Sequence, residues 1–280
     1  MTKTDFDNLP ISNDFMFKKV MQNERLCKRL VAEIMQKEIA DIIYTEAEKT
    51  IEPYYDSRGV RLDVIIADER NTRYNLEMQV KNTLGDATGE PVLPKRTRYY
   101  QSIMDMDMLQ KGQDFDELNP LVLAFICAFD FFNEGRYVYT FKSRCLENLE
   151  LELKNDVTVL LLNSQGTHGN VTPLVKNFLR YVNDHIPIDE FTQEVEAEVV
   201  RVRRSKEARR EYMVLSTRLK DERMEGRREG LTVGRAERNR EIALNMLKEK
   251  LLLDKIVKFT DLEKEEIYAL AQENGLTVVE

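Results

Sequence analysis

Two short alternating segments between Gly59 and Lys81 constrain the fold of this 280-residue chain more than any other feature. The first reads Gly-Val-Arg-Leu-Asp-Val-Ile-Ile-Ala and the second reads Arg-Tyr-Asn-Leu-Glu-Met-Gln-Val-Lys, with the polar break Asp-Glu-Arg-Asn-Thr between them. Such alternation on either side of a polar break predicts the two strands of a β-hairpin. If the strands pair symmetrically about Arg70, Asp63 faces Glu77 with their Cβ atoms about 5 Å apart.

One face of this hairpin gathers polar oxygen atoms, while the other face is apolar. Gln79 shares the face of Glu77, because side chains on a strand repeat every second residue. Two carboxylates on an otherwise apolar hairpin suit a hard cation, and without one their mutual repulsion raises one pKa. From spacing alone, the alternative is an ordinary solvated hairpin face.

Further motifs surround the hairpin in a recognisable order. They are Asn13-Asp14 with Phe17-Lys18, Glu77-Met78-Gln79, Arg96-Thr-Arg98-Tyr99-Tyr100, Lys111-Gly112 and the apolar run from Leu121 to Ala128. Over roughly residues 10–215, this arrangement resembles the Rpn family of recombination-promoting nucleases and transposases, within the PD-(D/E)XK nuclease superfamily. The resemblance implies a Mg²⁺- or Mn²⁺-dependent DNA endonuclease linked to recombination and transposition of mobile DNA.

The resemblance also assigns roles to the hairpin residues. Asp63 and Glu77 are expected to be metal ligands and catalytic residues. Gln79 stands where the superfamily usually has a lysine. Because glutamine can orient water but cannot act as a base at neutral pH, we expect Gln79 to orient the attacking water.

Residues outside the hairpin complete the expected site. Asp14 matches an acid of the first helix that often lies near the metal in this superfamily, and its alternative role is to cap that helix. Arg96 and Tyr100 lie four residues apart on one helix face, where an arginine fork and a hydroxyl suit a DNA phosphate. Arg98 is a further phosphate-binding candidate on another side of the helix. For this group, the alternative is an exposed arginine packed along a half-buried tyrosine.

Composition limits the partners and the compartment. The net charge of −8 argues against general affinity for nucleic acid, but residues 201–240 contain 14 Lys/Arg and 7 Asp/Glu. This basic stretch either follows a DNA backbone or forms the solvated face of a long helix. Three widely spaced cysteines and two histidines favour free thiols in a reducing cytoplasm over disulfides or a zinc site. No apolar run approaches the ~20 residues of a membrane span, so we expect a cytoplasmic protein without membrane contact.

The order of elements predicts an α/β fold with a PD-(D/E)XK-like core, in which helices flank a central mixed sheet, followed by a charged helical C-terminal extension. Helices are expected over residues 14–36, 95–111, 172–186 and much of 189–250. Strands are expected within 39–50, in the hairpin, and over 121–130, 136–143 and 156–163. The domains expected are a nuclease-like domain (1–190), a charged helical segment (191–240) and a small helical unit resembling a helix-turn-helix (241–280).

The C-terminal extension suggests a protein partner. Gly226, Gly230 and Gly234 either weaken their helix into a hinge or let a second helix approach closely. The last expected helix is acidic and would be repelled by phosphates, so a homodimer or oligomer formed through this segment is the simplest partner. A second hypothesis for the whole chain is a nuclease-fold protein that acts as a binding or regulatory module, without binding Mg²⁺ or Mn²⁺.

Overall fold

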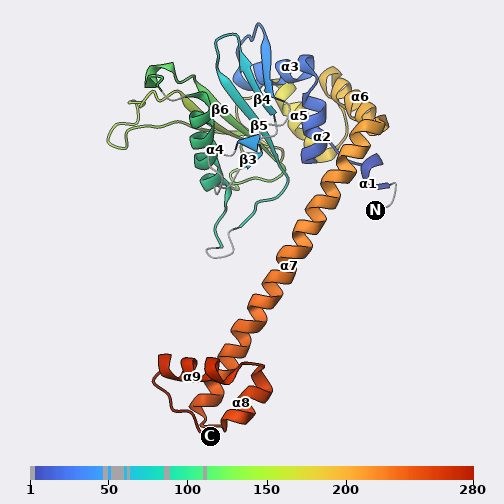
Figure 1. Ribbon diagram of the computed structural model, residues 1–280. Helices are drawn as coiled ribbons and strands as arrows, with labels where there is room; N and C mark the ends of the chain where they lie inside the picture. The colour runs from blue at the N-terminus through green and yellow to red at the C-terminus, as the bar shows by residue number, and fades with distance from the viewer. Residues whose placement is uncertain (1–3, 47–49, 52–59, 62–63, 85–88, 110–111) are drawn as a thin grey trace. The chain divides into compact units, whose positions relative to one another are not determined.

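The computed structural model describes residues 4–46, 50–51, 60–61, 64–84, 89–109 and 112–280. The chain divides into two compact units, Met1–Arg210 and Glu211–Glu280. The first unit contains a six-stranded mixed sheet (Figure 1). Its strands, in spatial order, are β1 (Ile42–Glu46), β4 (Val64–Asp68), β5 (Arg73–Gln79), β6 (Leu121–Cys127), β8 (Val157–Asn163) and β7 (Val138–Phe141).

The directions of the strands make the sheet mixed, as predicted. β5, β6 and β8 run parallel to one another, whereas the β1/β4, β4/β5 and β7/β8 pairs are antiparallel. A separate antiparallel pair is formed by β2 (Thr50–Ile51) and β3 (Val60–Arg61). The parallel centre is formed by near-continuous apolar strands, and all seven residues of β6 are buried.

The β4/β5 hairpin has the predicted register. Val64 pairs with Leu76 and Ala67 pairs with Arg73, so the described pairs are symmetric about Arg70. Asp63, the residue before β4, lies outside the described residues.

Asp68 closes the turn of this hairpin from inside the protein. Its buried carboxylate accepts hydrogen bonds from the backbone N–H groups of Arg70 (3.0 Å) and Thr72 (2.9 Å). It also accepts bonds from the hydroxyl of Tyr74 (2.7 Å) and from Lys37 Nζ (2.9 Å). The turn that sets the register is thereby tied to the core.

We expect Asp68 to make the stability of the fold sensitive to acid. Burial alone would raise the pKa of Asp68, but hydrogen bonds from Tyr74, Lys37 and the backbone together lower it from 3.8 to about 2. A carboxyl whose pKa is lowered by folding stabilises the protein above its unfolded-state pKa, and this contribution disappears as pH falls through the folded-state pKa. The contribution is about 2 kcal/mol at neutral pH, of which about half is lost by pH 3.

Urea unfolding at pH 6 and pH 3 measures this effect. Wild-type protein should lose about 1 kcal/mol more of its unfolding free energy on acidification than Asp68→Asn, which has no carboxyl to protonate. Equal losses in the two proteins would contradict the assignment.

Helices cover both faces of the sheet, as predicted. α4 (Leu93–Met108) packs Tyr100, Ile103 and Met104 against the face that carries Leu123 and Phe125. The opposite face lies against the group formed by α2 (Asp14–Met21), α3 (Glu24–Met35), α5 (Pro173–Asp184) and α6 (Glu190–Arg204), seen beside the sheet in Figure 1. A short helix, α1 (Thr4–Asp7), precedes them.

The single helix predicted over residues 14–36 is two helices, α2 and α3. Asn13 caps α2 by accepting a hydrogen bond from Met16 N (3.2 Å), and Asn23 caps α3 by accepting one from Leu26 N (3.4 Å). An asparagine side chain that accepts from the backbone in this way competes with the backbone hydrogen bonds that would continue the preceding helix. Asn23 therefore starts a new helix inside the predicted one.

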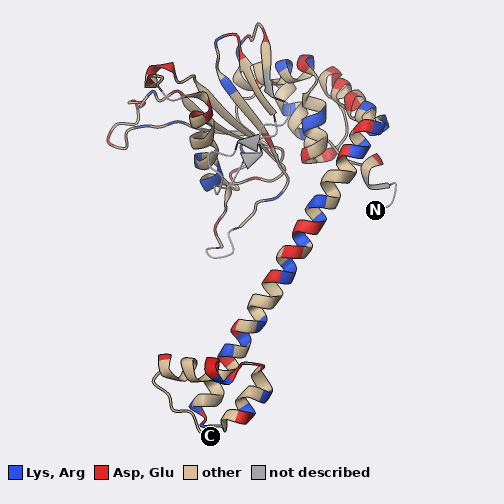
Figure 2. Ribbon diagram, viewed as in Figure 1, with Lys and Arg blue, Asp and Glu red and all other residues tan. Residues whose placement is uncertain are grey.

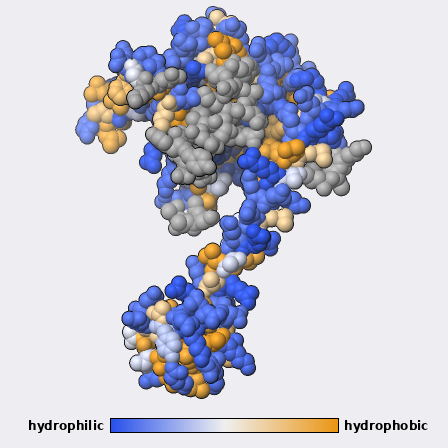
Figure 3. Space-filling model, in the orientation of Figure 1, coloured by the Kyte–Doolittle hydropathy of each residue, from blue (hydrophilic) through white to orange (hydrophobic). Residues whose placement is uncertain are grey.

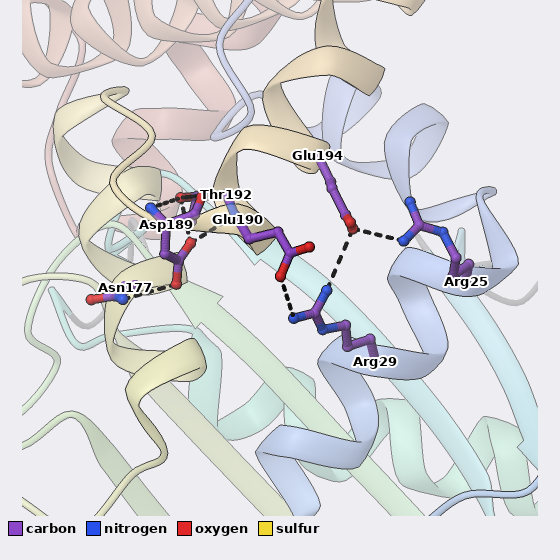
Figure 4. Close-up of polar contacts among 7 residues, drawn as sticks. All are labelled: Arg25, Arg29, Asn177, Asp189, Glu190, Thr192 and Glu194. Atoms are coloured by element: carbon purple, nitrogen blue, oxygen red, sulfur yellow. Dashed lines mark hydrogen bonds and ion pairs between the residues drawn. The ribbon is translucent and has the colours of Figure 1, made fainter.

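Ion pairs join α3 to α6 at the surface (Figure 4). Glu194 accepts from Arg25 (2.9 Å) and lies 3.5 Å from Arg29 Nη1. At the start of α6, Asp189 accepts from Thr192 N (2.8 Å) and from Asn177 Nδ2 (2.8 Å), which links α5 to the cap. The cap supplies most of the stabilisation here, because exposed ion pairs contribute little.

The connection between β7 and β8 projects from the sheet. Its limbs are joined by Glu152, which lies 2.8 Å from Lys142 Nζ and 3.5 Å from Arg144 Nη2. Figure 3 shows hydrophobic surface at the left of the first unit, the side from which this connection projects. The exposed leucines of the connection are Leu146, Leu149, Leu151 and Leu153.

The second unit has its own small core. The end of α7 (Lys206–Lys248), α8 (Leu253–Thr260) and α9 (Lys264–Glu273) enclose it. Its fully buried members include Ala243, Leu247, Leu253, Ile256, Ile267 and Ala271. The helices expected near this end of the chain are therefore present and pack together.

α7 runs through Gly226, Gly230 and Gly234 without a break, so the predicted hinge does not interrupt the helix. Beyond the helix's own backbone and the adjoining residues, no described atom lies within 4 Å of the place where a Cβ would stand at each of these glycines, so no second helix of the described chain packs against them. Lysines and arginines alternate with acids along α7 (Figure 2), and Arg218 pairs with Glu222 one turn away (3.0 Å). This pattern is typical of a solvated helix face. In the part of the chain that the structure describes, no helix has the length and apolar character needed to cross a membrane.

Candidate active site

Glu77 brings a carboxylate into the interior of the first unit. It lies on β5 beside Phe125 of β6, and only 2% of its surface is exposed. Asn75, two residues earlier on the same face and fully buried, donates from Nδ2 to Glu77 Oε1 (3.2 Å). An ionised carboxylate is costly to bury without charged or hydrogen-bonding partners. The burial of Glu77 therefore indicates either an internal ion pair or a functional site.

Arg96 reaches Glu77 from the first turns of α4. Its Nη2 atom lies 3.7 Å from Glu77 Oε2, and its Nη1 atom donates to Gln79 Oε1 (2.9 Å). Nη2 also donates to the hydroxyl of Tyr100 (2.5 Å). One guanidinium thus contacts three of the side chains predicted to form the site.

Tyr100 fixes this arginine in place. Its buried ring packs against Phe125, with 6.1 Å between ring centroids, and the Arg96 guanidinium carbon lies 5.1 Å from its centroid. The four-residue spacing puts both side chains on one face of α4, as predicted. Arg98 is exposed and lies on a different side of the helix.

Asp14 lies at the start of α2, close enough for the charge of Arg96 to act on it. The residue as a whole is exposed, but partial burial of its carboxyl raises the pKa, an effect that its own backbone N–H and the charge of Arg96 partly offset. Asn13, not Asp14, provides the side-chain cap of α2. The capping alternative for Asp14 is therefore wrong.

The structure brings together Glu77, Gln79, Arg96 and Tyr100, with Asp14 at their border. Asp63 lies outside the described residues, so its distance from Glu77 stays a prediction. Asn75 belongs to this cluster and was missed from the sequence. The two-residue period that linked Gln79 to Glu77 also points to Asn75.

The oxygen atoms of this cluster are suitable ligands for a hard cation. Glu77, Gln79, Asn75 and Asp14 offer carboxylate and amide oxygens, the ligands that Mg²⁺ and Mn²⁺ prefer. The Oδ1 atom of Asn75 is buried and has no hydrogen-bond partner among the described residues, so the cluster contains an oxygen with unused acceptor capacity. No group of three or more His, Cys, Asp and Glu residues suited to a metal occurs within the described ranges, which do not include Asp63.

Comparison with known proteins identifies the family. Residues 11–168 match the model of the PD-(D/E)XK nuclease family transposase, a span that contains the whole cluster. Nucleases of the PD-(D/E)XK type generally use divalent metals. Searches among curated proteins and among solved structures returned no match. Because the matched span exceeds half of the chain and its sheet has the mixed order described above, this protein belongs to the PD-(D/E)XK nuclease family transposases.

Proposed function

We propose that this protein is a DNA endonuclease dependent on Mg²⁺ or Mn²⁺ that acts in the recombination or transposition of mobile DNA. The observation that carries the proposal is the buried carboxylate of Glu77 in contact with Arg96, inside the span that matches the nuclease family. The carboxylate provides a negatively charged ligand for a metal cation, and the planar guanidinium of the arginine provides a phosphate-binding group in the same cluster.

In this proposal Asp63 and Glu77 hold the metal, with Asp14 as a further acid beside them. The bound ion would polarise the scissile phosphate, activate a water molecule and stabilise the departing alkoxide. Gln79 orients the attacking water through its amide. Arg96 and Tyr100 hold oxygens of the phosphate, for which the planar guanidinium has matching geometry.

A metal titration of the purified protein tests the proposal most directly. Calorimetry should show Mg²⁺ and Mn²⁺ binding to wild-type protein, and supercoiled plasmid should be nicked only when one of these ions is present. Asp63→Ala should lose both properties while keeping the wild-type circular dichroism spectrum. Nicking that continues unchanged in Asp63→Ala would rule out the assigned site.

A second candidate function is a binding or regulatory module built on the nuclease fold. The observation that favours it is the same Arg96, because a guanidinium beside Glu77 supplies the positive charge that a metal would otherwise provide. The titration separates the two candidates, since this module would bind neither ion and would not nick DNA.

Two further parts of the proposal concern the surroundings of the protein. We propose a cytoplasmic location, in keeping with free thiols at Cys27, Cys127 and Cys145. We also propose self-association through the C-terminal helical segment, which sedimentation velocity of the full chain would test.

A further inference from the structure

Asn75 places an amide in the buried centre of the sheet. The residue is fully buried on β5, and its pairing partners are Ile65 on β4 and Leu123 on β6. Asparagine is depleted in strands, and an amide buried among apolar side chains destabilises the fold unless hydrogen bonds compensate. Its Oδ1 atom has no hydrogen-bond partner in the part of the chain that the structure describes. Packing alone therefore does not explain an asparagine at this position.

The hydrogen bond from Asn75 to Glu77 does account for this amide. Nδ2 of Asn75 donates to Oε1 of Glu77 (3.2 Å), and the two residues share one face of β5. An ionised carboxylate can only accept hydrogen bonds, so the amide turns its NH₂ group toward Glu77 and its oxygen away. One of the two oxygens of Glu77 thus has a donor fixed by the sheet.

The two oxygens of Glu77 face different groups. Oε1 is held by Asn75, whereas Oε2 is the oxygen that lies 3.7 Å from Arg96 Nη2. The Arg96 side chain enters from α4 and is one-third exposed, whereas Asn75 lies in the interior of the sheet. Oε2 is therefore on the side of the partly exposed arginine, and Oε1 is on the side of the buried amide.

We propose that Asn75 is a positioning residue that makes Glu77 bind a divalent cation through Oε2 alone. The inference rests on the proposed nuclease function, which places such a cation at Glu77. A hydrogen bond to a ligand side chain fixes its orientation, and the one from Nδ2 to Oε1 opposes chelation of a single ion by both oxygens. Ca²⁺ readily takes both oxygens of a carboxylate, whereas Mg²⁺ is smaller and requires near-ideal octahedral geometry. Asn75 therefore favours Mg²⁺ over Ca²⁺ at this site.

Calorimetric titration of full-length Asn75→Leu with Mg²⁺ and with Ca²⁺ tests this role. Leucine has the same branched outline as asparagine but no donor, so position 75 no longer holds Oε1. The affinity for Mg²⁺ should fall about tenfold, the lower end of the loss typical when the partner of a metal ligand is removed. Ca²⁺ should bind at least as tightly as it binds wild-type protein. The preference for Mg²⁺ over Ca²⁺ should thus fall at least tenfold.

Asn163→Leu is the matched control. Asn163 is another buried asparagine of this sheet, at the end of β8, and its Nδ2 donates to the backbone oxygen of Arg136 (3.0 Å) instead of to a site residue. A merely structural defect weakens the binding of both ions alike, so Asn163→Leu should keep the wild-type ratio of the two affinities. Equal weakening of both ions in Asn75→Leu, or an unchanged ratio, would overturn the inference.

Infrared spectroscopy of wild-type protein covers the case in which Asn75→Leu does not fold. In protein with ¹³C-labelled glutamate, the two carboxylate stretching bands that change on addition of Mg²⁺ should have the wide separation typical of binding through one oxygen. A narrow separation, typical of binding through both oxygens, or bands that do not change would overturn the inference.

The outcomes separate this inference from the proposed function. If wild-type protein binds Mg²⁺ and nicks DNA, and Asn75→Leu has the wild-type preference for Mg²⁺, then Asn75 has no such role and the proposed function stands. If wild-type protein binds neither ion and does not nick DNA, the proposed function fails and the role of Asn75 fails with it.

Discussion

Replacing Glu77 by glutamine is expected to reduce Mg²⁺-dependent nicking about 1,000-fold, in the range found when a group that stabilises transition-state charge is removed. Glutamine has nearly the same shape and keeps an oxygen that can accept from Asn75 Nδ2, now 3.2 Å from Glu77 Oε1. It removes the negative charge that is proposed to hold the cation. The affinity for Mg²⁺ should therefore fall together with the rate.

The fold should tolerate this change. Removing a buried carboxylate costs little when its hydrogen bonds are retained, and the Arg96 side chain is one-third exposed, so water can solvate it. Urea unfolding should give a free energy within about 1 kcal/mol of wild type. Glu69→Gln is the matched control, because Glu69 lies in the turn of the same hairpin and contacts the backbone of Ala40. If Glu77→Gln nicks at the Glu69→Gln rate, Glu77 does not act in the reaction.

The hairpin shows which parts of this fold the sequence could predict. Its register follows from two local facts, the two-residue period of its strands and the polar residues at its centre, and the described pairs agree with it. The strands β6 and β8 were predictable for a different reason, because their apolar runs are short and nearly continuous, as in buried strands. The register of the parallel pairs, which places Glu77 beside Phe125, depends on contacts between distant segments and was not predicted.

The division of residues 14–36 shows where periodicity misleads. The apolar spacing continues from Phe17 to Val31, since both helices bury a face in the same core. Asn23 breaks the helix through a local hydrogen bond to Leu26 N, which hydrophobic spacing does not register.

The sequence predicted which residues belong to the candidate site better than it predicted the contacts between them. Arg96 was expected to bind phosphate, and the family resemblance supplied that role. Nothing in the sequence indicated that the same guanidinium lies 3.7 Å from Glu77 and donates to Gln79. Such contacts depend on how α4 docks on the sheet, which residue spacing within the helix does not determine.

This arrangement predicts that Arg96→Met will uncouple metal binding from catalysis. Without the guanidinium, the metal no longer competes with a fixed cation for Glu77, so the affinity for Mg²⁺ should rise about tenfold. The phosphate loses its arginine fork, so nicking at saturating Mg²⁺ should fall about 100-fold. Calorimetry and plasmid nicking of the same preparations measure the two effects.

A double-mutant cycle isolates the contact between Arg96 and Glu77. Without metal, Arg96→Met removes a cation beside a buried carboxylate and should lower the unfolding free energy by about 2 kcal/mol. In the Glu77→Gln background no buried charge remains at that position, so the same substitution should cost at least 1 kcal/mol less. Additive costs, together with unchanged Mg²⁺ affinity in Arg96→Met, would mean that Arg96 does not act as the internal counter-ion of Glu77.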